Sequence, residues 1–369
     1  MRRVTKIAAV VAVVSSLALA GCSRNDDATP SSGTDESSGT TSEEPAASGD
    51  LCKDATGDGP KVGLAFDVGG VGDLSFNDSA FAGLEKAVKE LGATCTTGEA
   101  GQGEAESARE DRLRQMADAG MNPVIGVGFA YSESVNVVAP DYPEVNFAVI
   151  DGFDPDKEPN DNVAYLGFAE EQGSYLVGVA AAKKSKTGNI GFVGGVAMDL
   201  IKKFEAGYTA GAKSVNPKIK VQVKYIQESD LSGFGDPAGG KQAAAAEFEK
   251  GADVVYHAAG GSGAGVFEAA TEADKWAIGV DSDQFLSAPA DQQPHILTSM
   301  LKRVDVATFS MVESVADGTP LTSYTTYDLS KDGVGYAVSG GNVDDIVADL
   351  DAAKADIVSG KVKVPTVPK

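Results

Sequence analysis

The chain has 369 residues, which is enough for about two globular domains. Its 54 acidic and 31 basic residues give a formal net charge of −23, which argues against a nucleic-acid-binding surface because contacts with phosphates require clustered cations. A hydrophobic fraction of 42% is enough to form a buried core. Two histidines and three cysteines leave too few ligands for a zinc cluster.

The first 22 residues have the organisation of a lipoprotein signal peptide. Residues 2–6 carry three basic side chains, and an apolar run at 7–19 follows that is too short to span a bilayer. The run ends in Leu-Ala-Gly-Cys22, which is similar to the bacterial lipobox, whose cysteine is diacylated and becomes the mature N-terminus. An ordinary secretory signal with a chance cysteine is the alternative. We expect Cys22 to anchor the protein outside the cytoplasmic membrane, because two acyl chains hold a protein there stably.

Residues 23–50 are predicted to form a disordered, acidic, Ser/Thr-rich linker. They contain no Val, Ile, Leu, Met, Phe, Tyr or Trp, so they cannot offset the entropy cost of becoming ordered. As a flexible coil the segment would span about 30 Å, which would hold a domain clear of the lipid surface.

Two cysteines remain if Cys22 carries lipid. Cys52 precedes the first expected strand, and Cys95 lies where the second expected strand begins. Neighbouring parallel strands could bring the two together, and an oxidising compartment favours a disulfide. Two separate buried thiols are the alternative.

From residue 61 onward, short apolar runs alternate with amphipathic stretches. The runs typical of buried strands lie at 61–66, 123–127, 146–150, 189–193, 221–226, 252–256 and 276–280. Helical periodicity separates most of them, at 81–91, 104–119, 171–183, 199–214 and 241–250. This alternation predicts an α/β protein with parallel sheets built from right-handed crossovers. The units are too many for one open sheet, so we expect two doubly wound lobes.

Three aspartates directly follow apolar runs, namely Asp67, Asp151 and Asp281. Ligands of open parallel sheets bind beyond the carboxyl ends of the strands, so these side chains are candidates for a ligand site. A carboxylate accepts two hydrogen bonds from a vicinal diol, which suits sugar or ribose hydroxyls. The alternative is that each aspartate caps the helix that follows it.

The glycine-rich segments at 67–73 and 260–266 do not match known phosphate-binding or hydrolase motifs. Neither fits G-x-G-x-x-G or a Walker sequence, and Ala264 replaces the closing glycine of a nucleophile elbow. The first segment is similar to the start of calcium-dependent nucleoside hydrolases, but Gly69 and Gly72 stand where acids are needed. Such a hydrolase stays as the enzymatic alternative. We expect a non-enzymatic protein with no cofactor and no metal site.

Two segments, one of which extends the glycine-rich stretch at 67–73, carry a family signature: Asp67-Val-Gly-Gly-Val-Gly-Asp-Leu-Ser-Phe-Asn77 and Ile278-Gly-Val-Asp-Ser-Asp283. Together with matching stretches across residues 61–340, they resemble the BMP/Med/PnrA-like family of basic membrane lipoproteins. These are solute-binding proteins of ATP-driven importers, and several bind purine nucleosides. The resemblance implies a type I periplasmic-binding fold, with two lobes joined by three crossovers. We expect an N-terminal lobe at 51–168 and 285–320 and a C-terminal lobe at 169–284 and 321–369.

The resemblance also implies roles for polar residues. Asp67 is expected to bind a polar edge of the ligand, and Asp151 to accept a hydrogen bond from the ribose or the base. Asp281 and Lys302 are expected near the ribose hydroxyls, where Lys302 could also orient a cleft aspartate. Gly260 would meet the ligand through its backbone, because a glycine-rich turn allows close approach.

Two aromatic side chains are expected to sandwich the base. Phe76, in Ser-Phe-Asn77, would stack on one face and Phe234 on the other, each contact contributing about 1–3 kcal/mol. Asn77 is expected to contact the ligand as part of the same signature. The match at Phe234 is looser, and without the family a place for both rings in the core or on a lobe surface is the simpler interpretation.

The combined prediction is a lipid-anchored, extracytoplasmic binding protein of an ABC transporter. It would capture a nucleoside, with a purine preferred, between its lobes and then dock on permease subunits, with no nucleic-acid partner. Binding of another sugar-like or small polar solute stays open. Two other functions also stay open, a nucleoside hydrolase and a receptor that only signals.

Overall fold

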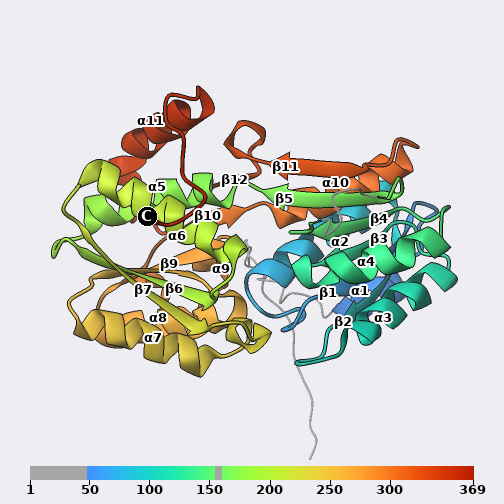
Figure 1. Ribbon diagram of the computed structural model, residues 1–369, viewed down its shortest axis with the longest axis horizontal. Helices are drawn as coiled ribbons and strands as arrows, with labels where there is room; N and C mark the ends of the chain where they lie inside the picture. The colour runs from blue at the N-terminus through green and yellow to red at the C-terminus, as the bar shows by residue number, and fades with distance from the viewer. Residues whose placement is uncertain (1–47, 154–159) are drawn as a thin grey trace, which may run out of the picture. The chain divides into compact units, whose positions relative to one another are not determined.

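The computed structural model describes residues 48–153 and 160–369, which form two α/β lobes (Figure 1). The signal peptide, Cys22 and residues 23–47 of the expected linker lie outside the described residues. Helix α1 (Ser48–Asp54) begins inside the segment predicted to be disordered, so the folded region starts before residue 51. Within the described residues, no helix combines the length and the apolar character needed to cross a bilayer.

The N-terminal lobe is built on a six-stranded sheet in the order β11-β5-β4-β3-β1-β2. Its strands, all parallel, are β1 (Lys61–Phe66), β2 (Thr94–Glu99), β3 (Val124–Val127), β4 (Phe147–Ile150), β5 (Val163–Phe168) and β11 (Ser323–Tyr327). Helices α2 (Phe76–Leu91) and α10 (Val304–Ala316) pack together on one face. Helices α3 (Glu106–Asp118) and α4 (Ser132–Val138) cover the other. Buried apolar side chains on both faces explain why these strands are continuous apolar runs in the sequence.

The C-terminal lobe repeats this plan with the order β12-β10-β9-β8-β6-β7. Its strands are β6 (Asn189–Val196), β7 (Lys220–Gln227), β8 (Val254–Ala258), β9 (Trp276–Asp281), β10 (Ile296–Lys302) and β12 (Val334–Tyr336), of which β12 is antiparallel to β10. Helices α5 (Glu170–Lys184), α6 (Asp199–Val215) and α11 (Val347–Val358) lie on one side (Figure 1). Helices α7 (Pro237–Glu249) and α8 (Gly263–Ala273) pack on the other, and α9 (Gln284–Ser287) follows β9.

Seven short 3-10 helices complete the described elements. They are η1 (Phe129–Tyr131), η2 (Ala139–Asp141), η3 (Leu231–Phe234), η4 (Gly260–Ser262), η5 (Gln293–His295), η6 (Leu329–Lys331) and η7 (Asp344–Ile346). Four of them, η1, η3, η4 and η6, begin soon after the carboxyl end of a strand. The structure also contains the Cys52–Cys95 disulfide, which joins α1 to β2.

The chain crosses between the lobes three times, after β5, after β10 and after β11. The two α/β lobes and their three crossovers agree with the fold expected from the sequence, and both sheets are parallel except for β12. The lobe boundaries expected from the sequence differ from those in the structure. Strand β10 lies within 285–320 but pairs with β9 in the C-terminal sheet, and β11 lies within 321–369 but pairs with β5 in the N-terminal sheet. An apolar run looks the same whichever sheet it joins, so only the long-range pairing locates it.

Candidate ligand-binding site

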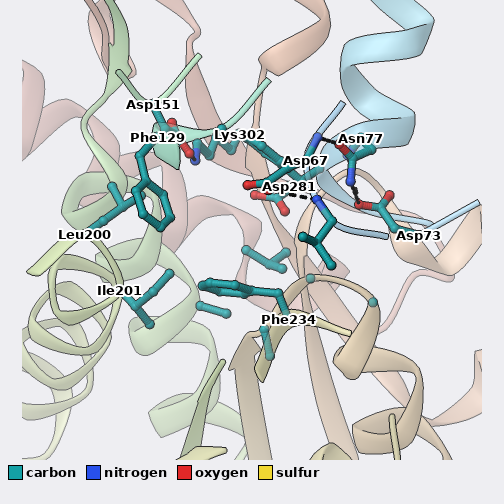
Figure 2. Close-up of a pocket in the computed structure, with 18 of the residues that line it drawn as sticks. Asp67, Asp73, Asn77, Phe129, Asp151, Leu200, Ile201, Phe234, Asp281 and Lys302 are labelled. Carbon is teal, nitrogen blue, oxygen red and sulfur yellow. Dashed lines mark hydrogen bonds and ion pairs between the residues drawn. The ribbon is translucent and has the colours of Figure 1, made fainter. Parts of the chain in front are cut away.

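A cavity lies between the lobes and is lined by residues at the carboxyl ends of strands from both sheets. Figure 2 shows side chains from both lobes around it, with the carboxylates of Asp67 and Asp281 and the rings of Phe129 and Phe234 facing one central space. All eight residues predicted to bind ligand line this cavity. They are Asp67, Phe76, Asn77, Asp151, Phe234, Gly260, Asp281 and Lys302. The structure brings them together, and their roles toward a ligand stay predictions.

Asp67 presents a carboxylate to the cavity directly after β1. Its Oδ1 accepts a hydrogen bond from the backbone N–H of Val68 at 2.8 Å. Its Oδ2 lies against Gly128, where a Cβ atom would be 2.3 Å away, and Gly128 has a φ of +107°. Position 128 therefore requires glycine for two reasons: the backbone conformation is left-handed, and there is no room for a Cβ atom. Burial raises the pKa of Asp67 from 3.8 to about 6.

Asp73 and Asn77 organise the loop that leads into α2. The Asp73 carboxylate accepts hydrogen bonds from the backbone N–H groups of Ser75, Asn77 and Asp78 at 2.9, 2.9 and 3.2 Å. The Asn77 side chain donates to Asp73 at 3.0 Å and accepts from the Asp67 N–H at 3.1 Å. Despite these bonds, burial raises the pKa of Asp73 to about 7. The helix-capping role considered for the strand-end aspartates thus belongs to Asp73, which the sequence analysis did not single out.

Asp281 joins the two lobes at the end of β9. It adopts a φ of +66°, and its Oδ2 accepts a 2.6 Å hydrogen bond from the hydroxyl of Ser75, in the N-terminal lobe. Beside it, the Ser282 hydroxyl and the Gln284 amide both donate to the carbonyl of Leu74, at 3.1 and 2.9 Å. Burial raises the pKa of Asp281. This carboxylate therefore faces the cavity while it is tied to the opposite lobe.

Lys302 is a buried cation at the floor of the cavity, with a side chain only 2% exposed. Its Nζ forms an ion pair with Asp151, which follows β4 and has a φ of +59°. It also lies 4.9 Å from the ring centre of Phe76, 5.1 Å from Phe168 and 5.6 Å from Phe204. Burial alone would disfavour the ammonium, but nearby carboxylates, Asp151 foremost, outweigh it and raise the pKa of Lys302. Lys302 is thus a donor that carries its charge at neutral pH, and three aromatic rings that favour a cation lie near it.

Phe234 reaches the cavity from η3 because neighbouring glycines leave room for its ring. A Cβ atom on Gly195, in β6, would lie 2.5 Å from the ring, and one on Gly260 would lie 3.2 Å from the Phe234 carbonyl. Gly260 also has a φ of +54°. The ring is partly buried and lines the cavity, so a place in the hydrophobic core alone does not describe it.

Part of the apolar wall of the cavity was not predicted from the sequence. Phe129 follows β3 and Gly128, while Leu200, Ile201 and Phe204 come from the first turns of α6. Phe129 obeys the same strand-end rule that identified the aspartates and could have been found by it. The α6 residues could not, because helical periodicity does not distinguish a face that packs on the sheet from one that faces a cavity.

The cavity offers many more hydrogen-bond acceptors than donors. Four aspartates line it against one lysine and one asparagine side chain: Asp67, Asp73, Asp151, Asp281, Lys302 and Asn77. Anionic ligands are disfavoured by this charge, whereas a neutral molecule rich in hydroxyl or ring N–H donors fits it. The apolar wall adds a surface for a planar group. Within residues 48–153 and 160–369, no three His, Cys, Asp or Glu side chains are placed to hold a metal ion.

Comparisons with known proteins identify relatives over most of the chain. Residues 61–367 match the Bmp family model, described as ABC transporter substrate-binding protein PnrA-like. The chain is 37% identical over 323 residues to the ABC transporter nucleoside-binding protein BmpA of Lactococcus lactis, covering 83% of this chain and 89% of that protein. It is 36% identical over 325 residues to the CD4+ T-cell-stimulating antigen of Listeria monocytogenes, covering 83% and 88%.

A solved structure supports the same relationship. The crystal structure of ABC transporter system solute-binding proteins from Aeropyrum pernix K1 superposes with a TM-score of 0.71. It shares 28% sequence identity and covers 84% of this chain and 94% of its own.

Proposed function

The chain belongs to the Bmp family of PnrA-like ABC transporter substrate-binding proteins, and from this we propose that it binds a nucleoside, preferably a purine nucleoside, for import. As a substrate-binding protein of this family it works outside the cytoplasmic membrane with a small-molecule ligand and a permease, and we infer from the family's substrate-binding role that it is not an enzyme. The finer points, which are the nucleoside, its base and the lipid anchor, are our proposal.

One observation carries the ligand proposal, the combination of acceptor-rich and aromatic walls in a single inter-lobe cavity. Asp67, Asp151 and Asp281 can accept hydrogen bonds from ribose hydroxyls and base N–H groups, and Lys302 can donate one. Phe234 offers a face on which a base can stack, a contact worth about 1–3 kcal/mol. A neutral nucleoside provides the donors and the flat ring system together, whereas a sugar lacks the ring system. The nucleoside-binding relative supports the same class of ligand.

Calorimetric titration of the protein with guanosine, inosine, adenosine and cytidine tests this proposal. We expect heat of binding with the purine nucleosides and a weaker response with cytidine. The Phe234→Ala variant should bind about ten- to a hundredfold more weakly, since it loses one stacking surface. Phe153→Ala is the matched control, because Phe153 is 45% exposed and does not line the cavity. Heat with a pentose or an amino acid but with none of the nucleosides would reject the ligand class.

The lipid anchor is a separate part of the proposal and is supported by the lipobox-like Leu-Ala-Gly-Cys22 alone. Growth with labelled palmitate should label the wild-type protein in the membrane fraction. Cys22→Ser should abolish the label, because the thioether that carries the diacylglycerol cannot form. Equal labelling of both proteins would contradict the assignment.

A further inference from the structure

The Lys302 ammonium has a second carboxylate near it that does not line the ligand cavity. Glu170 Oε1 lies 3.9 Å from Lys302 Nζ, and both side chains are almost fully buried, at 1% and 2% exposed. Asp151, which forms the direct ion pair, belongs to the N-terminal lobe, whereas Glu170 opens α5 of the C-terminal lobe. The ammonium therefore sits between carboxylates from two lobes.

Glu170 is in turn held by a cation at the protein surface. Its Oε2 accepts a hydrogen bond from Lys203 Nζ at 3.1 Å, and the Lys203 side chain is 36% exposed. Its Oε1 is buried and has no hydrogen-bond partner in the described part of the chain, which leaves Lys302 as the nearest group that can stabilise it. The result is a chain of alternating charges, Asp151, Lys302, Glu170 and Lys203, that runs from the ligand cavity to the surface.

The same chain connects the cavity wall to the first crossover. Lys203 belongs to α6, whose residues Ile201 and Phe204 line the cavity, and Glu170 comes two residues after β5 ends. Helices α5 and α6 pack against each other, so the Glu170–Lys203 pair fixes one end of that contact. Displacing Glu170 would thus affect both the cation at the cavity floor and the apolar wall beside it.

We propose that Glu170 is a positioning residue for the ligand site. Its carboxylate holds the Lys302 ammonium, which leaves an oxygen of Asp151 able to accept a hydrogen bond from the ligand. With Glu170 ionised, the four charges sum to zero. Without the charge of Glu170, Asp151 carries more of the neutralisation of Lys302, with Asp281 as the other carboxylate that acts on the ammonium. A ligand hydroxyl then competes more strongly with the ammonium for the Asp151 carboxylate. The Asp151 Oδ1 atom has no hydrogen-bond partner among the described residues, so it is the acceptor at stake. This inference rests on the proposed nucleoside-binding function.

The charge state of Glu170 is sensitive to its surroundings. Burial raises its pKa to about 7, although Lys302 and Lys203 oppose that shift and Asp151 adds to it. These three side chains are the charged groups that face it. Protonation of Glu170 removes the same negative charge that the Glu170→Gln substitution removes. The variant should therefore lack the part of the pH dependence of ligand affinity that comes from Glu170.

The test compares Glu170→Gln with the neighbouring Glu171→Gln in the full chain, using guanosine titration at pH 8. We expect Glu170→Gln to raise the Kd about tenfold and Glu171→Gln to leave it near wild type. Lys203→Gln, which changes a partly exposed side chain and should fold normally, should raise the Kd about threefold by weakening the support of Glu170. Thermal unfolding of each variant verifies that it is folded.

A ligand-free measurement separates this inference from the proposed function. Lysine side-chain NMR follows the titration of Lys302, whose pKa should fall in Glu170→Gln and stay unchanged in Glu171→Gln. If the wild type binds no nucleoside, the proposed function fails and the NMR comparison alone decides the link between Glu170 and Lys302. A wild-type Kd in Glu170→Gln overturns the proposal. So does weaker binding with an unshifted Lys302 titration, because the effect would then be a general structural one.

Discussion

Replacing Asp67 by asparagine should stabilise the ligand-free protein while weakening ligand binding. The carboxylate receives one backbone hydrogen bond, from Val68, and otherwise faces the cavity and Gly128. Burial raises its pKa from 3.8 to about 6, so the folded protein holds the ionised form at a cost. A shift of about two units corresponds to about 3 kcal/mol of unfolding free energy at pH values above the folded pKa.

The sign of the pH dependence follows from the raised pKa. Well below pH 3.8, Asp67 is protonated in both the folded and the unfolded chain, and the wild type and Asp67→Asn should approach equal stability. As the pH rises toward 7, the unfolded chain loses its proton first, so the wild type loses stability that the variant keeps. The shifted pKa already includes the hydrogen bond from the Val68 N–H, so we expect a gain of about 3 kcal/mol at pH 8, or about 4 °C in Tm.

Thermal unfolding between pH 4 and pH 8, with guanosine titration at pH 8, measures both effects. Asp328→Asn is the control of opposite sign, because hydrogen bonds from Ser330 and Lys331 help to lower the pKa of Asp328 and its removal should destabilise the protein at neutral pH. An Asp67→Asn variant that is no more stable than the wild type at pH 8 would show that the buried carboxylate does not destabilise the fold. A gain that does not shrink toward pH 4 would contradict burial of the ionised carboxylate as its cause.

Two further substitutions test residues that contact the aspartates of the cavity. Gly128→Ala would place a Cβ atom 2.3 Å from Asp67 Oδ2 at a φ of +107°, so we expect about 1–3 kcal/mol lower stability and strongly reduced nucleoside affinity. Gly318→Ala, with a φ of +69° and open space around it, should show the backbone cost alone, and equal binding losses in both variants would contradict the steric argument. Ser75→Ala removes the hydroxyl bonded to Asp281, which should raise the pKa of that carboxyl further and weaken guanosine binding about tenfold, more so at pH 6 than at pH 8. Unchanged binding in calorimetry at both pH values would show that the Ser75 bond does not support the site.

The site residues found from the sequence share a local signal. Asp67, Asp151 and Asp281 each stand directly after an apolar run, and two of them adopt a positive φ that turns the chain at the strand end. The rule that ligands bind beyond carboxyl ends needs only the order of residues along the chain. The signature around Phe76 added the aromatic and amide neighbours, which the strand-end rule does not reach.

Other parts of the site depend on contacts between residues far apart in the sequence. Lys302 pairs with Asp151 across 151 positions, and Ser75 bonds Asp281 across 206. No sequence periodicity connects such partners, because each pair forms only after both sheets have formed and their carboxyl ends face the same cavity. The capping role of Asp73 was missed for a different reason, since several acids near α2 could have served equally well by sequence.

The sequence by itself determined the class of fold, the two lobes and the strand ends that carry the aspartates, because apolar periodicity and the residues that interrupt it are local properties of the chain. Only the tertiary structure decided which sheet β10 and β11 join, that α6 forms the apolar wall, and that Glu170 stands behind Lys302. These features depend on strand pairing and on buried ion pairs between segments that are far apart in the sequence. Such contacts contribute to stability only when the folded chain brings the segments together and excludes water from them.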